Sequence, residues 1–283
     1  MTVTPLFPTG GEATALRGLY LRLALHRQAA AGEICIYANY ISSLDGRIAL
    51  PIAHDDANER DFAVPTAIAN QRDWRLYQEL AAQADVMITS ARYFRQLAEG
   101  RAQDLLPVGR EPAYADLRDF RQAAGLKPQP DVVIVSNSLH IPAAALDQLR
   151  DRQLIVCCSE QADAAAVHAL QARGVQVWRA GAQQVFGQRL KQHLIAAGYR
   201  SAYMIAGPQV HRTLLADGVL DELFLTTHLS LLGGDHFHTI LADHLPQPVT
   251  LQLQHLFLDE GDLNDGGGQI FAHYRYCYGG NAP

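Results

Sequence analysis

The chain has 283 residues, a net charge of −6, 48% hydrophobic residues and 18% charged ones. This balance is typical of a globular protein with a substantial buried core, folded as one large domain or two small ones. An acidic chain without a long cluster of lysine and arginine is not expected to bind nucleic acid. Its four cysteines are too few for a disulfide framework in a chain of this length, so a reduced, cytoplasmic protein is expected.

Residues 1–31 are predicted to form a helical extension ahead of the main domain. The stretch 13–29 is rich in leucine, but Arg17, Arg22 and Arg27 interrupt it. It therefore lacks the uninterrupted apolar core of a signal peptide, and it is too short and too charged to span a membrane. We interpret it as an amphipathic helix that packs on the domain or on a partner subunit.

Residues 32–283 are predicted to form one domain, because strand-like and helix-like segments alternate along them. Strands are predicted at residues 33–41, 85–89, 131–136, 153–157, 175–178, 202–206 and 222–228. Helices are predicted at residues 66–82, 91–99, 161–173, 182–197 and 209–217. Helix ends are marked by Gly100, Gly174, Gly198 and Gly218. This order predicts an α/β fold with a mostly parallel central sheet and helices on both faces.

The end of the chain departs from that alternation. Residues 249–258 and 269–278 both have the pattern of strands, and a glycine-rich segment separates them. Two strands joined in this way predict a C-terminal antiparallel hairpin, so the sheet is expected to be mixed. Residues 100–130 carry four prolines and little periodicity, and they are predicted to form a long loop or lid.

A charged turn follows the first predicted strand of the domain. The apolar run 34–41 is rich in β-branched and aromatic residues, and Ser43-Leu44-Asp45-Gly46-Arg47 ends it. Glycine accepts a positive φ and aspartate bonds back to nearby backbone, so the segment predicts a tight turn. It is either a surface turn or a ligand contact, because α/β proteins place such contacts at the ends of buried strands.

Four segments, in chain order, resemble motifs of the reductase domain of the bifunctional riboflavin-biosynthesis deaminase–reductase. They are residues 43–49, 80–92, 206–223 and 231–235. The resemblance extends over about residues 33–278. It implies a dihydrofolate-reductase-like fold, a homodimer, and reduction of a heterocyclic metabolite by NADPH.

Two predicted loops have the chemistry to bind the phosphates of that cofactor through backbone N–H groups at a helix N-terminus. Thr89-Ser90-Ala91 opens one helix and Gly207-Pro208-Gln209 opens another. No G-x-G-x-x-G follows the first strand, so an ordinary Rossmann site is not predicted. Arg92 either pairs with a 2′-phosphate or is simply an exposed arginine. The predicted cofactor contacts are Ser42, Thr89, Ser90, Ala91, Arg92, Ser136, Asn137, Gly207, Pro208, Gln209, Val210 and His211.

The resemblance implies that Asp45 lies beside the nicotinamide and the substrate, so Asp45 is the predicted catalytic residue. It would orient amino or amide groups of the substrate or relay a proton, or else it only fixes its own turn. Asn39, Tyr40 and Ile205 are predicted substrate contacts. Strand alternation allows only one of Asn39 and Tyr40 to face the pocket.

The substrate side of the sequence departs from the family. Ala81 and Ile205 stand where those enzymes carry an arginine and a glutamate, and residues 94–101 lack their Asp-Asp-Pro segment. Either Arg95, Arg101 and Arg110 replace the lost contacts to a sugar phosphate, or the substrate differs.

Three functions therefore stay open for the chain. They are a 5-amino-6-(5-phosphoribosylamino)uracil reductase, a dihydropterin reductase, and a catalytically inactive scaffold of the same fold. The chain carries no zinc-deaminase motifs, so at most a stand-alone reductase is expected. His236 and His238 have a spacing that suits a metal on a strand, but their segment reads as a loop, and no metal site is predicted.

Overall fold

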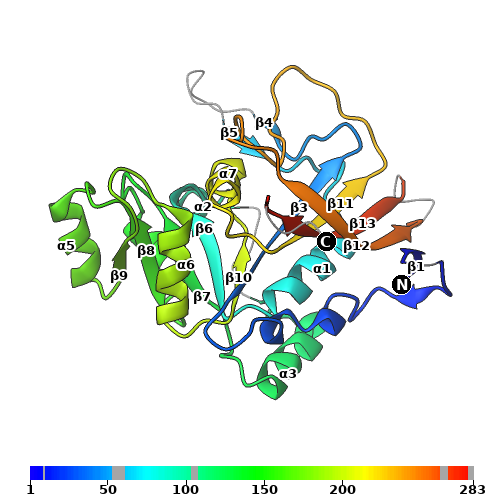
Figure 1. Cartoon of the computed structure of the whole chain (residues 1–283), viewed down its shortest axis with the longest axis horizontal. Helices are drawn as coiled ribbons and strands as arrows, with labels where there is room; N and C mark the ends of the chain where they lie inside the picture. The colour runs from blue at the N-terminus through cyan, green and yellow to red at the C-terminus, as the bar shows by residue number, and fades with distance from the viewer. Residues whose placement is uncertain (9, 53–60, 103–107, 262–266, 280–283) are drawn as a thin grey trace.

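The computed structural model describes residues 1–8, 10–52, 61–102, 108–261 and 267–279. In these residues eleven strands form one sheet, in the order β2-β1-β12-β13-β11-β3-β10-β6-β7-β8-β9 (Figure 1). The strands β11, β3, β10, β6, β7, β8 and β9 run parallel, and the remaining neighbours pair antiparallel. The mixed, mostly parallel sheet and its C-terminal hairpin, β12–β13, confirm the predicted fold class.

The strands of this sheet are β1 (Thr2–Phe7), β2 (Thr14–Ala15), β3 (Cys35–Ser43), β6 (Val86–Ser90), β7 (Asp131–Val135), β8 (Leu154–Cys158), β9 (Gln176–Arg179), β10 (Ser201–Met204), β11 (Glu222–His228), β12 (Thr250–Asp259) and β13 (Gln269–Cys277). A separate two-stranded hairpin consists of β4 (Leu50–Ile52) and β5 (Asp61–Ala63). The helices are α1 (Gln71–Ala81), α2 (Ala91–Ala98), α3 (Ala115–Ala123), α4 (Ala143–Asp147), α5 (Ala164–Ala172), α6 (Gly187–Ala196) and α7 (Pro208–Ala216).

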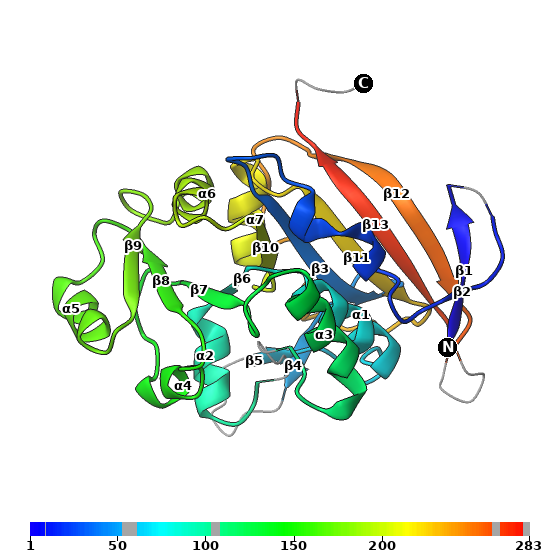
Figure 2. The same cartoon turned by 90° about the horizontal axis from the view of Figure 1, so that it is seen from below.

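The sheet divides the interior into two apolar layers. Tyr37 and Tyr203 point into the layer covered by α1 to α5, whereas Ile36 and Met204, next to them along the strands, point into the layer covered by α6 and α7. In Figure 2, α6 and α7 lie above the sheet and α1 to α4 below it. Because both faces are covered, the central strands are apolar on both sides, as their continuous hydrophobic runs predict.

Carboxylates fix the amino-terminal edge of the parallel strands. Asp221, directly before β11, accepts the backbone N–H of Ile36 at 2.7 Å, so that it bridges to the neighbouring strand β3. Asp85 accepts the N–H of Ser201 at 3.0 Å, and Asp131 accepts that of Gln153 at 3.0 Å. Each acid satisfies a backbone donor that the sheet leaves unpaired, which stabilises the register of adjacent strands.

The amphipathic helix expected over residues 13–29 is wrong. The segment forms β2 and two short 3₁₀ helices, Leu21–Leu23 and Leu25–Arg27, and the preceding β1 pairs with β12. Buried side chains of α1 and of the residues just after it explain the difference. Glu79 accepts the N–H groups of Gly18 and Tyr20 at 2.6 and 2.9 Å, and Gln83 accepts that of Leu25 at 2.8 Å. These N–H groups therefore bond to side chains outside the segment and not to carbonyls of a helix. The predicted boundary between an extension and the main domain at residue 31 stays a prediction.

The prediction of a loop or lid over residues 100–130 is wrong for residues 112–123, which form the 3₁₀ helix Pro112–Tyr114 and then α3. Residues 103–107 lie outside the described part of the chain. Arg121 of α3 is fully buried and donates to the carbonyls of Ala82 and Ala84 at 3.1 and 2.8 Å. The helix therefore belongs to the packed body of the protein. Among the described residues, no helix is long and apolar enough to cross a bilayer.

Candidate functional site

The carboxyl ends of the central strands bring the predicted cofactor segments together. β10 lies between β3 and β6 in parallel register, with Met204 opposite both Ala38 and Ile88. The chain passes from β6 at Ser90 directly into α2, and from β10 through residues 205–207 into α7. Since α2 and α7 cover opposite faces of the sheet, their first turns flank one edge from both sides.

Neither of these two helices has a side-chain cap at its N-terminus. Ser90 and Gly207 occupy the N-cap positions without a capping hydrogen bond from their own side chains. Asn70 caps α1 and Asp163 caps α5 by accepting first-turn N–H groups. The helices α3, α4 and α6 also begin without a side-chain cap, so what sets α2 and α7 apart is their position at the carboxyl edge of the sheet, directly after the central strands β6 and β10.

In the first turn of α7 the N–H of Val210 bonds to the carbonyl of Gly207 at 3.1 Å, and Pro208 has no N–H. The other first-turn N–H groups of α2 and α7 are not claimed by a side-chain cap, and such groups bind anions at helix N-termini.

The predicted cofactor residues fall into an exposed and a buried set. Those at least partly exposed at this edge are Ser90, Arg92, Asn137, Gly207, Pro208, Gln209 and Val210. Those with buried side chains are Ser42, Thr89, Ala91, Ser136 and His211. A Cβ built on Gly207 would meet no atom within 4 Å outside its chain neighbours, so a ligand has room to approach this backbone closely.

His211 belongs to the core rather than to the exposed edge. Its Nδ1 lies 2.6 Å from the carbonyl of Ile240 and its Nε2 lies 2.7 Å from the hydroxyl of Tyr276. Burial lowers the pKa of this imidazole. Both ring nitrogens are engaged and the residue is 1% exposed, so its side chain is not available to a cofactor in this arrangement.

The predicted substrate residues lie on two faces of the sheet. Asn39 accepts the hydroxyl of Tyr203 at 2.6 Å, on the face covered by α1 and α2, and Ile205 packs on the same layer. Tyr40 points to the opposite layer, where its ring lies 5.1 Å from that of His211 and its hydroxyl donates to the carbonyl of Ala206 at 3.1 Å. Asn39 and Tyr40 therefore do not share a pocket.

Asp45 ties the end of β3 to the glycine-rich loop (residues 229–234) that follows β11. Its carboxylate accepts the N–H of Gly233 at 2.8 Å, that of Leu232 at 3.2 Å and the hydroxyl of Ser43 at 2.5 Å. The hydrogen bonds from Ser43 and then Gly233 lower the pKa of Asp45 to about 2. The group is therefore ionised at neutral pH, where it accepts hydrogen bonds and holds no proton to donate.

Arg47 completes the same connection. Its Nε donates to the carbonyl of Gly233 at 3.1 Å, its Nη1 lies 3.2 Å from the Asp45 carboxylate, and its guanidinium lies 4.2 Å from the ring centroid of Phe237. The charged turn that the sequence marked out thus anchors a second loop. The sequence predicts the turn and contains the Leu232-Gly233 motif, but nothing in it pairs the two.

A second polar cluster surrounds Asp61, a residue that the sequence did not single out. Arg92 Nη2 lies 2.7 Å from one carboxylate oxygen of Asp61, and Arg101 Nη1 lies 2.8 Å from the other. Gln96 donates to both oxygens at 3.1 and 3.0 Å. Partial burial raises the pKa of Asp61, but the hydrogen bonds from Gln96, Phe62 and Arg92 outweigh it and lower this pKa to about 2.

The three arginines considered as replacements for the lost contacts do not converge. Arg101 joins Arg92 in the Asp61 cluster. Arg95 donates at 3.4 Å to the carbonyl of His140. Arg110 pairs with Asp151, close to the amino end of β8 and hence at the opposite edge of the sheet.

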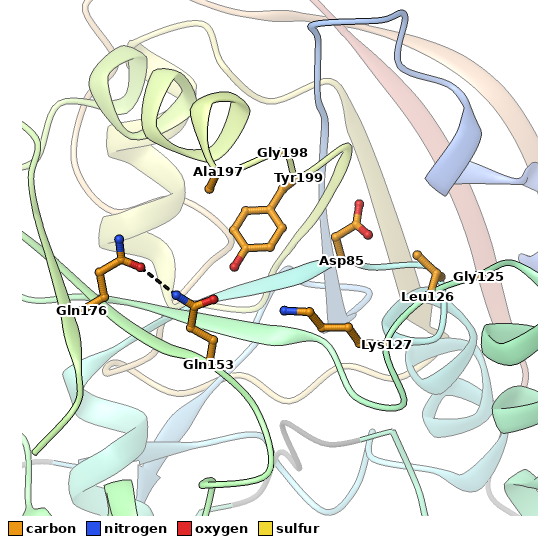
Figure 3. A pocket seen from close by; sticks show the side chains of 9 residues that line it. All are labelled: Asp85, Gly125, Leu126, Lys127, Gln153, Gln176, Ala197, Gly198 and Tyr199. Carbon is orange, nitrogen blue, oxygen red and sulfur yellow. Dashed lines mark hydrogen bonds between the residues drawn. The ribbon is translucent and has the colours of Figure 1, made fainter.

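Two cavities formed by described residues lie away from these residues. One of about 510 Å³ opens at the amino ends of the strands, and Figure 3 shows Tyr199, Lys127 and Gln153 pointing into it. The hydroxyl of Tyr199 and the ammonium of Lys127 both bond to Asp131, at 2.8 and 2.5 Å. Another of about 370 Å³ lies beside Lys191. Neither is lined by a predicted site residue, and ligands of open α/β sheets bind at the carboxyl edge, so we place the site there.

The model of the RibD C-terminal domain family matches residues 35–263. Among solved structures, a pyrimidine reductase-like protein from Corynebacterium diphtheriae is 18% identical with a TM-score of 0.67, over 94% of this chain and 100% of that one. The reductase Rib7 of Saccharomyces cerevisiae is 14% identical with a TM-score of 0.58, over 92% and 99%.

RibD of Acinetobacter baumannii is 17% identical with a TM-score of 0.57, over 87% of this chain and 59% of that one. The chain thus spans about three fifths of the length of that RibD. No curated protein sequence matches it. At these identities the solved structures show a shared fold, which agrees with the dihydrofolate-reductase-like fold expected from the motifs.

Proposed function

Because the chain belongs to the RibD C-terminal domain family, we propose that it is an NADPH-dependent reductase of a pyrimidine-type metabolite. The substrate we propose is of the 5-amino-6-(5-phosphoribosylamino)uracil type. Family membership gives the class of reaction. The observation that carries the proposal for this chain is the pair of uncapped helix N-termini, of α2 and α7, at the edge where Asp45 also lies.

The residues at this edge fit a dinucleotide. The first turns of α2 and α7 offer backbone N–H groups to phosphates, and the open space over Gly207 admits a ligand against the backbone. NADPH, when bound, supplies the hydride. Ser90, Asn137 and Gln209 are exposed enough to contact it. The side chain of His211 supports this edge from the core through its bonds to Ile240 and Tyr276.

For Asp45 we propose a positioning role. The carboxylate fixes the backbone of Leu232 and Gly233 and is itself held by Ser43 and Arg47. Hydride transfer depends on aligning donor and acceptor within a few tenths of an ångström, so a loop held in one place lowers the cost of that alignment. An ionised Asp45 also accepts hydrogen bonds from amino or amide groups of a substrate.

The proposal is tested by titrating the purified protein with NADPH and with NADH while following nicotinamide fluorescence. Binding of NADPH in preference to NADH, followed by NADPH oxidation with the phosphoribosylamino-uracil, supports it. If NADPH is oxidised with a dihydropterin but not with the phosphoribosylamino-uracil, the protein is a reductase whose substrate is a pterin and not the proposed pyrimidine. A protein that binds neither nucleotide would be a scaffold of this fold, and the proposal would fail.

We further propose that the chain acts as a homodimer in the cytoplasm. The family resemblance of the motifs supports the dimer, and four cysteines without a disulfide, three of them buried, suit a reducing compartment. Light scattering of the purified protein measures its molar mass in solution and so tests the homodimer directly.

A further inference from the structure

Three side chains and one backbone N–H donate to one carboxylate beside the proposed cofactor edge. We call this group the Asp61 clamp: Asp61 of β5, Arg92 and Gln96 of α2, and Arg101 shortly after α2. The two guanidiniums bind different oxygens of Asp61, at 2.7 and 2.8 Å, and the Gln96 amide reaches both oxygens. Asp61 Oδ1 also accepts the N–H of Phe62 at 2.9 Å.

The donor set of the clamp suits a phosphate monoester better than a carboxylate. Guanidinium groups form paired, charge-assisted hydrogen bonds with phosphate, which offers more acceptor oxygens and more negative charge than Asp61 does. The side chains of Arg92 and Arg101 are 36% and 33% exposed, whereas that of Asp61 is 17% exposed. The cations are therefore reachable from solvent while Asp61 covers their inner side.

The clamp is close to the proposed phosphate-binding turn. Arg92 is the second residue of α2, and Ser90, the N-cap of that helix, ends β6 at the carboxyl edge. The N-terminal turn of α2 adds its own partial positive charge to that of the two arginines. Glu99 pairs with the outer side of Arg101, but its side chain is half exposed, so solvent screens it.

Asp61 is attached to the periphery of the molecule. It begins β5 of the hairpin β4–β5, which pairs with no strand of the main sheet among the described residues. Two backbone hydrogen bonds, from Ile48 to His238 and from His238 to Ala49, hold the chain just before the hairpin. On the β5 side Phe62 stacks on His238 at 3.9 Å, and Arg92 donates to the carbonyl of Phe62. A rotation of the Asp61 side chain away from the arginines would therefore break no hydrogen bond of the main sheet among the described residues.

We propose that Asp61 is a built-in stand-in for a ligand's phosphate, and that a phosphate monoester binds between Arg92 and Arg101 by displacing it. This deepens the proposed function and rests on it for the identity of the ligand, whose phosphate comes from the 2′ position of the cofactor or from the sugar of the substrate. No covalent step is involved. One salt-bridge partner is exchanged for another, so Asp61 competes with the ligand and lowers its affinity.

Calorimetric titration with 2′-AMP and with ribose 5-phosphate tests this exchange without requiring turnover. Asp61→Asn removes the competing charge but keeps the shape, so one of the two probes should bind about tenfold tighter than to the wild type. Arg101→Gln should weaken the same probe by about tenfold. The probe that responds identifies the source of the phosphate.

Asp147→Asn is the matched control. Asp147 also binds two arginines, Arg150 and Arg173, both at 2.7 Å, but on the surface near α4. If Asp147→Asn raises the affinity as much as Asp61→Asn does, the gain is general electrostatics and the proposal is overturned. If Asp61→Asn does not fold, as judged by circular dichroism, Arg101→Gln decides, and unchanged binding of both probes overturns the proposal.

The outcomes for the clamp and for the reductase are separable. If the protein oxidises NADPH but neither Asp61→Asn nor Arg101→Gln changes its affinity for the phosphate probes, the proposed reductase function is supported and the proposal for the Asp61 clamp is overturned. If the two substitutions change the affinity for a phosphate probe as predicted but the protein does not oxidise NADPH, the Asp61 clamp is supported and the proposed reductase function is overturned.

Discussion

At the scale of single residues, Asp45 shows how a short motif is stabilised by a distant one. Its carboxylate bonds to the backbone of Leu232 and Gly233, and the sequence pointed to both segments without connecting them. The reason is physical: a turn is encoded locally by aspartate and glycine, whereas the contact between two loops depends on the register of β3 and β11. Asp61 was missed for the same reason, since its partners come from α2 and the residues after it.

Asp45→Asn should bind NADPH within about threefold of the wild type and lose at least about tenfold in kcat, because alignment suffers more than binding. Steady-state kinetics and fluorescence titration measure the two quantities. Ser138→Ala, at an exposed loop hydroxyl, serves as the neutral control. Unchanged kcat in Asp45→Asn would contradict the positioning role.

The same carboxylate makes a prediction about pH. Because its pKa is lowered to about 2 in the folded state, against about 3.9 in an unfolded chain, Asp45 stabilises the fold fully above about pH 4. That contribution disappears as pH falls through about 2. Urea denaturation should therefore show a higher free energy of unfolding for the wild type than for Asp45→Asn at pH 6, and a smaller difference between the two at pH 3. If this difference in the free energy of unfolding does not depend on pH, the ionised form of Asp45 is not the source of the stabilisation.

His211 has the same sign of pH dependence as Asp45, although the form that the fold favours is here the neutral ring. Burial lowers the pKa of its imidazole, so the contribution of the neutral ring is present above about pH 6.5 and falls as the pH drops below that value. His211→Leu leaves the Tyr276 hydroxyl and the Ile240 carbonyl without this partner and should cost about 2–3 kcal/mol at pH 8. Urea denaturation at pH 8 and pH 5.5 should show a smaller difference at the lower pH.

At the scale of elements, the N-terminal segment shows where sequence periodicity fails. Its leucines have helical spacing, yet Leu16, Leu19 and Leu25 are buried by a chain that turns at Gly18 and Ala24, where φ is +83° and +51°. Apolar spacing predicts which residues are buried, but it does not reveal that Glu79 supplies the hydrogen bonds of their backbone. The predicted strands, by contrast, were found within a few residues of their positions, because their apolar runs are short, rich in β-branched and aromatic residues, and bounded by turn residues.

Glu79→Ala should release the N-terminal segment. The residue is 0% exposed, pairs with Arg75 at 2.9 Å and binds two backbone N–H groups of the segment. Removing one partner of such a buried pair costs about 3–5 kcal/mol. Urea denaturation measures that loss, and hydrogen exchange should show faster exchange at Gly18 and Tyr20. Glu160→Ala, on the surface, should change stability by no more than about 0.5 kcal/mol.

At the scale of the whole molecule, the sheet is unevenly protected. Strands β3, β10, β6 and β7 are buried on both faces, whereas β12 has exposed or half-buried side chains along most of its length and β2 is a two-residue strand at the sheet's end. Local opening follows burial, so amide exchange should be slowest in the four central strands and fastest in β1 and β2. Mass spectrometry of exchanged peptides checks this order. Equal protection in β2 and β6 would contradict it.

The acids at the amino-terminal edge have an electrical consequence for the protein as a whole. Asp85 and Asp221 place negative charge at one end of the parallel strands, where Lys127 offsets the charge of Asp131, and the uncapped starts of α2 and α7 place partial positive charge at the other. The strands therefore lie along a gradient of electrostatic potential within a chain whose net charge is −6. The net charge repels an anion that diffuses toward this protein, whereas the starts of α2 and α7 attract it at short range, so its rate of arrival should depend on ionic strength.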